Sequence, residues 1–240
     1  MKNAISLFVT ALALSTAASS SGAVVPFTGS YAFSSNQTSG AQPAQTYNGT
    51  VITGLSPGSV SVSGATSSNS NGNYRASGWG TGATNASDTF TGAIDLNKYF
   101  SFTLTADAGY TFDMTSITFG LGRSGTGPRQ WQWRSSADNY ASALAAIAPV
   151  TGVTASGGVM TTLDTTASTW TGNVLTLSGA AFQGLSSITF RLYGYNAEAT
   201  AGTGGLQGPL SFAGFTETIP APGAVALLGV AGLIGSRRRR

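Results

Sequence analysis

Apolar and polar side chains alternate along residues 99–124, and a stretch with this period of two forms strands rather than helices. In its sequence, YFSFTLTADAGYTFDMTSITFGLGRS, the side chains of Phe100, Phe102 and Leu104 alternate with serine and threonine. Such alternation is typical of a strand that buries one face and exposes the other. The phase shifts at residues 115–116 before the alternation resumes, which predicts a β-bulge or a corner at that point.

Two later segments have the same character. VLTL (residues 174–177) is short, whereas LSSITFRLYGY (residues 185–195) is long enough to have two distinct faces. Its apolar face has Ile188, Phe190 and Leu192, and its polar face has Thr189, Arg191 and Tyr193. The hexapeptides MTSITF (residues 114–119) and LSSITF (residues 185–190) resemble each other, and we expect both to lie in central strands.

The composition also favours strands. The chain has 33 glycines and only 8% charged residues, so the lysines and glutamates that cover exposed helix faces are nearly absent. We expect one domain at residues 24–218, an all-β, jelly-roll-like antiparallel β-sandwich. A short helix or helical turn is predicted near residues 139–147, with Asp138 as its cap. Residues 29–85 have few large apolar side chains and are either the loosely packed part of this domain or a low-complexity linker.

The amino-terminal residues 1–23 have the pattern of a signal peptide. Lys2 precedes the apolar run AISLFVTALAL, and small residues follow as far as Ala23. Cleavage after Ala23 or after Ala18 fits the small-residue rule. A buried first helix is the alternative, but the run has no capping residues.

The carboxyl-terminal residues 219–240 form a second unusual end. Thirteen apolar residues, 223–235, precede Ser236 and the cluster Arg237, Arg238, Arg239 and Arg240. A helix of that length reaches ~20 Å, whereas a bilayer core is ~30 Å thick, so it would span only a thinned membrane or one in which the arginines snorkel. The charge rule then puts the arginines in the cytoplasm and the domain outside.

The two ends also account for the positive charge. Lys2 and the four terminal arginines are five of the 11 basic residues, so six basic residues face eight acidic ones in the rest of the chain. The interior of the chain therefore has no basic stripe for nucleic acid, and we expect no nucleic-acid partner. Cysteine and histidine are absent. This excludes disulfides, Ser-His and Cys-His nucleophiles, and the commonest zinc ligand.

Two further motifs carry little functional signal. GLGRSG (residues 120–125) fits G-x-G-x-x-G, but Pro128 and a period of two follow it instead of the helix that a dinucleotide site needs, so we interpret it as a turn between strands. Two facing carboxylates would be required for glycoside hydrolysis, and most of the acidic residues sit at apparent strand ends where turns explain them. These residues are Asp88, Asp95, Asp107, Asp113, Asp138, Asp164, Glu198 and Glu217. We expect no cofactor and no metal ligand set, with a structural calcium held by one aspartate and loop carbonyls left open.

The stretch RQWQWRSSADNY, which begins at Arg129, is the most distinctive part of the domain. On a strand, Trp131 and Trp133 share a face with Arg129, while Arg134 lies on the other face with two glutamines. The tryptophans either form a platform for sugar rings, with Arg134 among the hydrogen-bonding residues at its rim, or fill the space between two sheets. We prefer the second interpretation, because a chain with few large side chains needs its tryptophans for burial.

The tail PAPGAVALLGVAGLIGSRRRR resembles the PEP-CTERM sorting signal of Gram-negative bacteria. The resemblance implies a signal peptidase at the amino terminus, cleavage near the motif by an exosortase, and release from the inner membrane to the cell surface or the extracellular matrix. By position the motif is Pro220, Ala221 and Pro222, with Ala221 where glutamate is usual, so a variant enzyme or an uncut anchor stays open. The stretch RSGTGPRQWQWRSSADNY, with FRLYGYNA, is similar to a β-sandwich common among such proteins, and this likeness implies no activity.

The sequence therefore predicts an exported surface or matrix protein of structural or adhesive type, without catalytic activity and with extracellular polysaccharide as a partner. Two alternatives remain. One is a carbohydrate-binding module that uses Trp131 and Trp133, and the other is a glycan-active enzyme with a carboxylate pair.

Overall fold

The computed structural model describes residues 22–33, 43–70, 72–165 and 167–220. The expected signal-peptide helix and the expected hydrophobic helix of the tail lie outside these residues. Within the described part of the chain, no helix is long and apolar enough to cross a membrane. One compact unit extends over Val24–Thr218.

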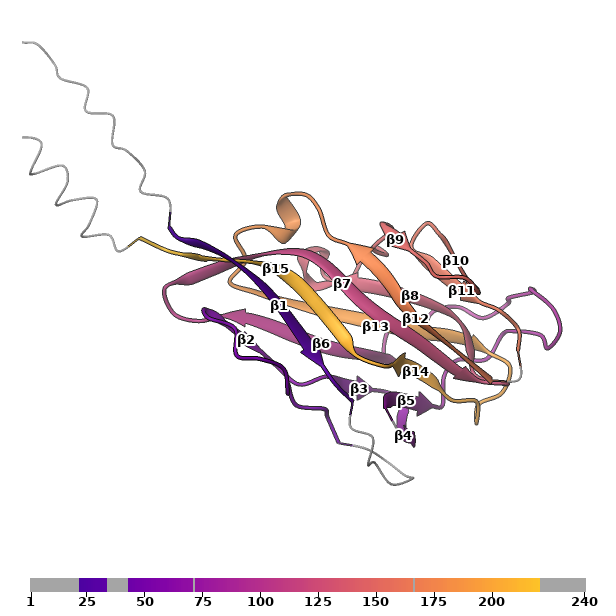
Figure 1. Ribbon diagram of the computed structural model, residues 1–240. Coiled ribbons are helices and arrows are strands. Elements are labelled where there is room, and N and C mark those ends of the chain that lie inside the picture. The colour runs from indigo at the N-terminus through magenta and orange to yellow at the C-terminus, as the bar shows by residue number, and fades with distance from the viewer. Residues whose placement is uncertain (1–21, 34–42, 71, 166, 221–240) are drawn as a thin grey trace, which may run out of the picture. The chain divides into compact units, whose positions relative to one another are not determined.

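This unit consists of two antiparallel sheets that pack face to face as a β-sandwich (Figure 1). We call them the β7 sheet and the β13 sheet, after β7 (Tyr110–Ser124) and β13 (Ser187–Ala197). The β7 sheet also contains β1 (Val24–Tyr31), β4 (Thr66–Ser70), β5 (Asn73–Ser77), β9 (Ile147–Ala148), β12 (Ala167–Thr176), β14 (Gly204–Gln207) and β15 (Leu210–Thr218). The β13 sheet also contains β2 (Leu55–Pro57), β3 (Ser61–Ser63), β6 (Tyr99–Ala106), β8 (Pro128–Ser135), β10 (Val153–Ser156) and β11 (Val159–Thr162). The described helical turns are η1 (Ser136–Asp138) and η2 (Ala180–Phe182).

The strand order puts β7 and β13 inside their sheets. The β7 sheet runs β1-β15-β7-β14-β5-β4, with β12 paired to β7 and β9 paired to β12. The β13 sheet runs β10-β11-β8-β13-β6-β2, with β3 also paired to β6. The expectation that MTSITF and LSSITF lie in central strands is therefore confirmed.

The core lies between the inner faces of the two sheets. The predicted alternation of β6 is confirmed, because Phe100, Phe102 and Leu104 are buried and the serine and threonines between them are not. Contacts between aromatic rings join the sheets: Phe102 of β6 stacks on Phe212 of β15, with ring centroids 6.2 Å apart. Burial of these rings supplies the main driving force for a domain that contains no cysteine.

The predicted irregularity at residues 115–116 is a β-bulge. Met114 pairs with Gly214 and Ser116 with Ala213, so Thr115 is the extra residue on β7. After the bulge, Ile117 and the following alternate residues face the core again. This inserted residue explains why the alternation of apolar and polar residues shifts by one position in the sequence.

Residues 139–147 form no helix, and the helical turn lies directly before them, at η1. Asp138 accepts hydrogen bonds from the backbone N–H groups of Ala141 and Ser142 as a cap would, at 3.2 and 2.9 Å. However, Asn139 and Tyr140 have left-handed φ angles of 56° and 62°, which a right-handed helix cannot contain. A short 3-10 turn precedes them instead, and the segment ends in strand β9.

The described residues of the segment 29–85 pack into the sandwich. They supply β2 to β5 and the last three residues of β1, together with Tyr31, Val60 and Tyr74, which are 0%, 0% and 1% exposed. Tyr31 also donates a hydrogen bond to the carbonyl of Gly58 at 2.6 Å. A few large residues are enough here, because serine, threonine and glycine allow close approach of the strands.

Candidate functional site

The two tryptophans of β8 lie in the core. Trp131 and Trp133 are 0% and 1% exposed. The ring of Trp133 lies 5.4 Å from that of Phe119, centroid to centroid, in an edge-to-face arrangement, and Trp131 packs against Trp79 in the same way at 5.7 Å. Neither tryptophan has a free ring face for a sugar. The glycan platform is therefore corrected: the tryptophans fill the space between the sheets.

The two faces of β8 lead to two separate polar clusters. Arg129 shares the inward face with the tryptophans, as predicted, and is 1% exposed. Arg134, the third of the predicted contact residues, is half-buried on the outward face with the two glutamines. Arg129 is thus buried at the end of the core, whereas Arg134 is partly exposed on a sheet surface.

The inner cluster pairs two buried arginines with three carboxylates. Arg123, at the end of β7, is 0% exposed and forms an ion pair with Glu198. Arg129 forms an ion pair with Asp88, and Asp164 lies 3.5 Å from each guanidinium group. We call these five residues the ion-pair cluster. Burial of two cations is tolerated because each has carboxylate partners.

Backbone carbonyls complete the partners of both guanidinium groups. Arg123 donates to the carbonyl oxygens of Gly125, Leu163 and Gly127, at 2.6, 3.2 and 3.3 Å. Arg129 donates to those of Ser87 and Thr162, at 2.8 and 3.0 Å. The arginines thereby fasten loops that are distant in sequence to the end of the sandwich.

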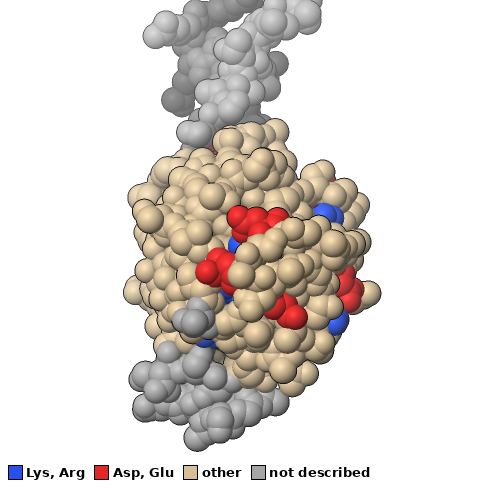
Figure 2. Space-filling view, turned by 90° about the vertical axis from the view of Figure 1, so that its right-hand side faces the viewer, with Lys and Arg blue, Asp and Glu red and all other residues tan. Residues whose placement is uncertain are grey.

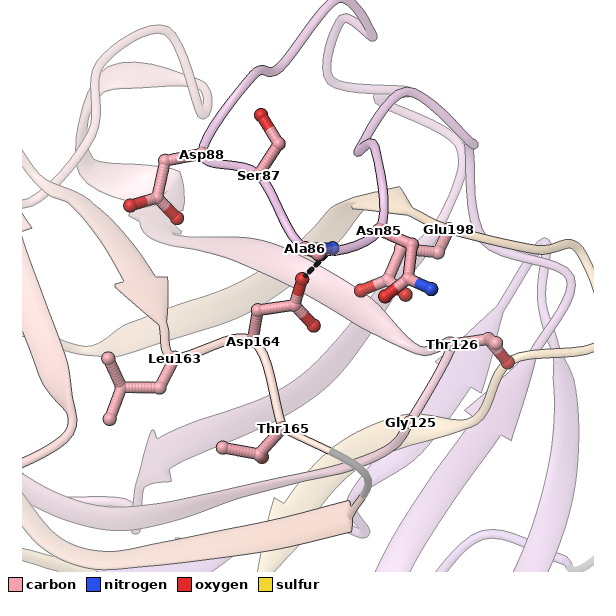
Figure 3. Close-up of a pocket in the computed structure, with 10 residues that line it drawn as sticks. All are labelled: Asn85, Ala86, Ser87, Asp88, Gly125, Thr126, Leu163, Asp164, Thr165 and Glu198. Atoms are coloured by element: carbon pink, nitrogen blue, oxygen red, sulfur yellow. Dashed lines mark hydrogen bonds between the residues drawn. The ribbon is translucent and has the colours of Figure 1, made fainter.

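A pocket of about 800 Å³ opens over the ion-pair cluster (Figure 3). Acidic side chains gather on this face of the protein (Figure 2). The side chain of Asp88 is 83% exposed, that of Asp164 is 20% exposed and that of Glu198 is 5% exposed. Asp164 also accepts a hydrogen bond from the backbone N–H of Ala86 at 2.6 Å, which draws the two walls together. The pocket is lined by Asn85, Ala86, Ser87, Asp88, Gly125, Thr126, Leu163, Asp164, Thr165 and Glu198.

The pocket thus brings together three of the eight acidic residues considered from the sequence. All three form ion pairs with one or both of the two arginines, so their main partners are within the protein. Across the described residues, no group of three or more histidine, cysteine, aspartate or glutamate side chains is arranged to hold a metal ion. The most evident role of the arrangement is to join loops.

The outer cluster combines two arginines with three tyrosines. The guanidinium carbon of Arg191 lies 3.7 Å from the ring centroid of Tyr140 and 4.1 Å from that of Tyr99. The guanidinium of Arg134 lies over the ring of Tyr193, 5.7 Å from its centroid. Tyr99 and Tyr193 are neighbours on adjacent strands, with ring centroids 5.5 Å apart. We call these five residues the Tyr–Arg face, which lies on the outer side of the β13 sheet.

The Tyr–Arg face is positively charged. Arg134 and Arg191 are direct register partners on β8 and β13, and none of the described carboxylates lies within 4.0 Å of either. Burial alone would lower the pKa of Arg191, but the hydrogen bond to Tyr193 and the tyrosine rings around it raise that pKa. The nearby Tyr195 has a raised pKa because of burial, and its hydroxyl accepts a hydrogen bond from Gln132 at 2.9 Å.

Sequence patterns indicate only part of each cluster. They put Arg129 on the inward face of β8, and Arg191 and Tyr193 on the polar face of β13. They do not indicate Tyr99 and Tyr140, because the first depends on the register between β6 and β13 and the second lies in a segment predicted to be helical. Of the sorting residues, Pro220 is exposed, whereas Ala221, Pro222 and residues 237–240 lie outside the described residues.

Comparison of the chain with protein-family models, with curated proteins and with solved structures finds no match.

Proposed function

We propose that the chain is an exported cell-surface or extracellular-matrix protein that acts by adhesion rather than catalysis, and that it holds polysaccharide on the Tyr–Arg face. One observation carries the proposal. Two half-buried tyrosine rings flank Arg191 on the outer side of an otherwise hydroxyl-rich sheet. Tyrosine and arginine combine apolar contact area with hydrogen-bonding groups, which is the combination that recognition of sugars requires.

The hydroxyl groups beside the Tyr–Arg face support the same proposal. On the outer side of β6, Ser101 lies opposite Arg191, and Thr103 lies opposite Thr189 on β13. The two threonine hydroxyls are 2.7 Å apart. These hydroxyl groups offer hydrogen-bond donors and acceptors beside the arginines, and they suit a ligand with many hydroxyl groups.

Replacement of Tyr140 by alanine is expected to weaken retention on polysaccharide. The full-length protein would be run through native gels that contain one polysaccharide each, neutral or acidic. Loss of one ring of the stack around Arg191 is expected to lower the affinity ~3- to 10-fold. Phe215→Ala is the matched control, because Phe215 is an exposed aromatic residue (41%) of the β7 sheet. Absence of retention in every gel, or equal weakening by both variants, would contradict the proposal.

We further propose that the tail sorts the protein. A signal peptidase would remove the leader, and an exosortase-like enzyme would act near Pro220, Ala221 and Pro222 while the tail engages the inner membrane. The intact mass of the protein recovered from the cell envelope and the medium is expected to lack about twenty residues at the carboxyl terminus, as the position of this motif implies. Recovery of a chain that ends at Arg240 from the membrane fraction would make the tail a permanent anchor.

A glycan-active enzyme is the second candidate, because the pocket over the ion-pair cluster brings three carboxylates together. Glycoside hydrolysis requires two of them on opposite sides of the bond that breaks. The arginine partners of Asp88, Asp164 and Glu198 weigh against this role. Release of reducing sugar from any of the same polysaccharides, abolished by Asp88→Asn, would replace the adhesive proposal with this one.

We also infer a jelly-roll topology for the sandwich. The eight principal strands pair from the outside inwards along the sequence, as β1 with β15, β6 with β13, β7 with β12 and β8 with β11. Nested pairing of this kind results when one long antiparallel ribbon wraps into two sheets, and it is what a jelly roll requires.

A further inference from the structure

Two tyrosine rings pack against the guanidinium group of Arg191. Its guanidinium carbon lies 3.7 Å and 4.1 Å from the ring centroids of Tyr140 and Tyr99. Contacts this close limit the approach of a ligand to the flat faces of the group. The planar edge with its N–H donors is the part of arginine that binds carboxylates in a bidentate manner.

Most of these N–H donors have no hydrogen-bond partner in the described part of the chain. Among the described residues, Nη1 makes one hydrogen bond, to the Tyr193 hydroxyl at 3.5 Å. Across the same described residues, Nε is buried without a hydrogen-bond partner, whereas Nη2 has no partner and is not among the buried atoms. Nη2 is therefore a donor that a bound group can reach, and Nη1 has a second N–H beyond its one long hydrogen bond. Arg134 differs, because it donates to the carbonyls of Tyr140 and Ala141, at 2.9 and 3.1 Å.

The charge arrangement around Arg191 favours an anion. Arg134 stands directly opposite it on the neighbouring strand, and like charges in that position destabilise a sheet. Asp138 is the acidic residue nearest in sequence to Tyr140. Its carboxylate accepts hydrogen bonds from the N–H groups of Ala141 and Ser142. A bound negative group would therefore relieve a repulsion that no described carboxylate relieves.

We propose that Arg191 binds the carboxylate of a uronate unit in an acidic polysaccharide, an inference that rests on the proposed adhesive function and names its ligand class. The row of hydroxyls that starts beside Arg191 explains why a polymer fits better than a small anion. Ser101, Thr103 and Thr105 follow one another on β6, opposite Arg191, Thr189 and Ser187 on β13. The row is ~13 Å long at the rise of a strand, so it extends well beyond one carboxylate.

The test compares two forms of one polymer, with the carboxylates free or converted to neutral methyl esters. Binding of the full-length protein to polygalacturonate and to its fully methyl-esterified form would be measured by calorimetry, with free galacturonate as a third probe. We expect binding to polygalacturonate at least ~10-fold tighter than to the ester, and weaker binding at high salt. Binding to both polymers with equal affinity would leave the adhesive function standing and overturn the uronate site. Binding to neither would overturn the uronate site, and the adhesive function would then be decided by retention in the polysaccharide gels.

Variants then test whether Arg191 is the residue that binds the carboxylate of the polymer. Arg191→Gln is expected to lower the affinity for polygalacturonate at least ~10-fold, and Arg191→Lys to restore only part of it, because an ammonium group lacks the planar fork. Arg75→Gln is the matched control, since Arg75 also has no carboxylate within 4.0 Å but belongs to β5 of the other sheet. If Arg191→Gln and Arg75→Gln lower the affinity for polygalacturonate equally, the effect comes from the net charge of the protein, and the proposed site is overturned. Free galacturonate that binds as tightly as the polymer would overturn the polysaccharide as the ligand.

Discussion

Arg123→Met is expected to lower the free energy of unfolding by about 3–5 kcal/mol, as measured by urea denaturation of the full-length protein. The side chain of Arg123 is 0% exposed, and its removal leaves Glu198, 5% exposed, without its cation. The carbonyl oxygens of Gly125 and Leu163 lose their donor as well. Buried acceptors without a partner carry their full desolvation penalty, which adds to the loss of the ion pair.

Two controls distinguish this effect from a general loss of charge. Lys98→Met removes a cation whose ion pair with Asp95, at 4.0 Å, is partly exposed on both sides. Its effect is expected to be below about 1 kcal/mol. The double variant Arg123→Met/Glu198→Met removes both partners and is expected to regain part of the stability that the single variant loses. Equal effects of Arg123→Met and Lys98→Met would contradict a structural role for the ion-pair cluster.

The ion-pair cluster also marks the limit of what sequence patterns predict here. A period of two is enough to put Arg129 on the inward face of β8, because successive side chains of a strand point to opposite sides. The carboxylates that pair with the two arginines belong to loops, at Asp88, Asp164 and Glu198. The positions of loops depend on how the whole sandwich closes, and no local pattern encodes that.

The fold is easier to predict from the sequence than the candidate sites, because strands leave a local pattern in the sequence and loop positions do not. Alternation identified β6 and β13, and its change of phase identified the bulge at Thr115, because burial of one sheet face leaves a direct trace in the sequence. The helix expected at residues 139–147 failed because alanine content and a capping aspartate are weak local preferences. Left-handed residues at Asn139 and Tyr140 turned the segment so that Tyr140 stacks on Arg191. The Tyr–Arg face thus depends on the very segment for which local propensity was misleading.

Trp133→Ala is expected to lower the free energy of unfolding by about 3–5 kcal/mol through loss of buried apolar contacts and formation of a cavity. Trp133 is 1% exposed and packs edge to face on Phe119 and Phe102, with centroids 5.4 and 6.2 Å away. Its indole nitrogen is buried without a hydrogen-bond partner among the described residues, so Trp133→Phe gives up none of the described hydrogen bonds and is expected to lose markedly less stability. Urea denaturation measures both variants.

The same two variants decide between a core and a ligand-binding role for this tryptophan. If Trp133 only fills the core, Trp133→Phe retains full affinity for polysaccharide, and Trp133→Ala retains it at temperatures where the variant is still folded. Phe215→Ala, an exposed aromatic change on the β7 sheet, is expected to shift the free energy of unfolding by no more than about 0.5 kcal/mol. Loss of binding by folded Trp133→Phe would mean that the β13 sheet opens to expose its inner face to the ligand. The proposal that the outer Tyr–Arg face holds the polysaccharide would then have to be abandoned.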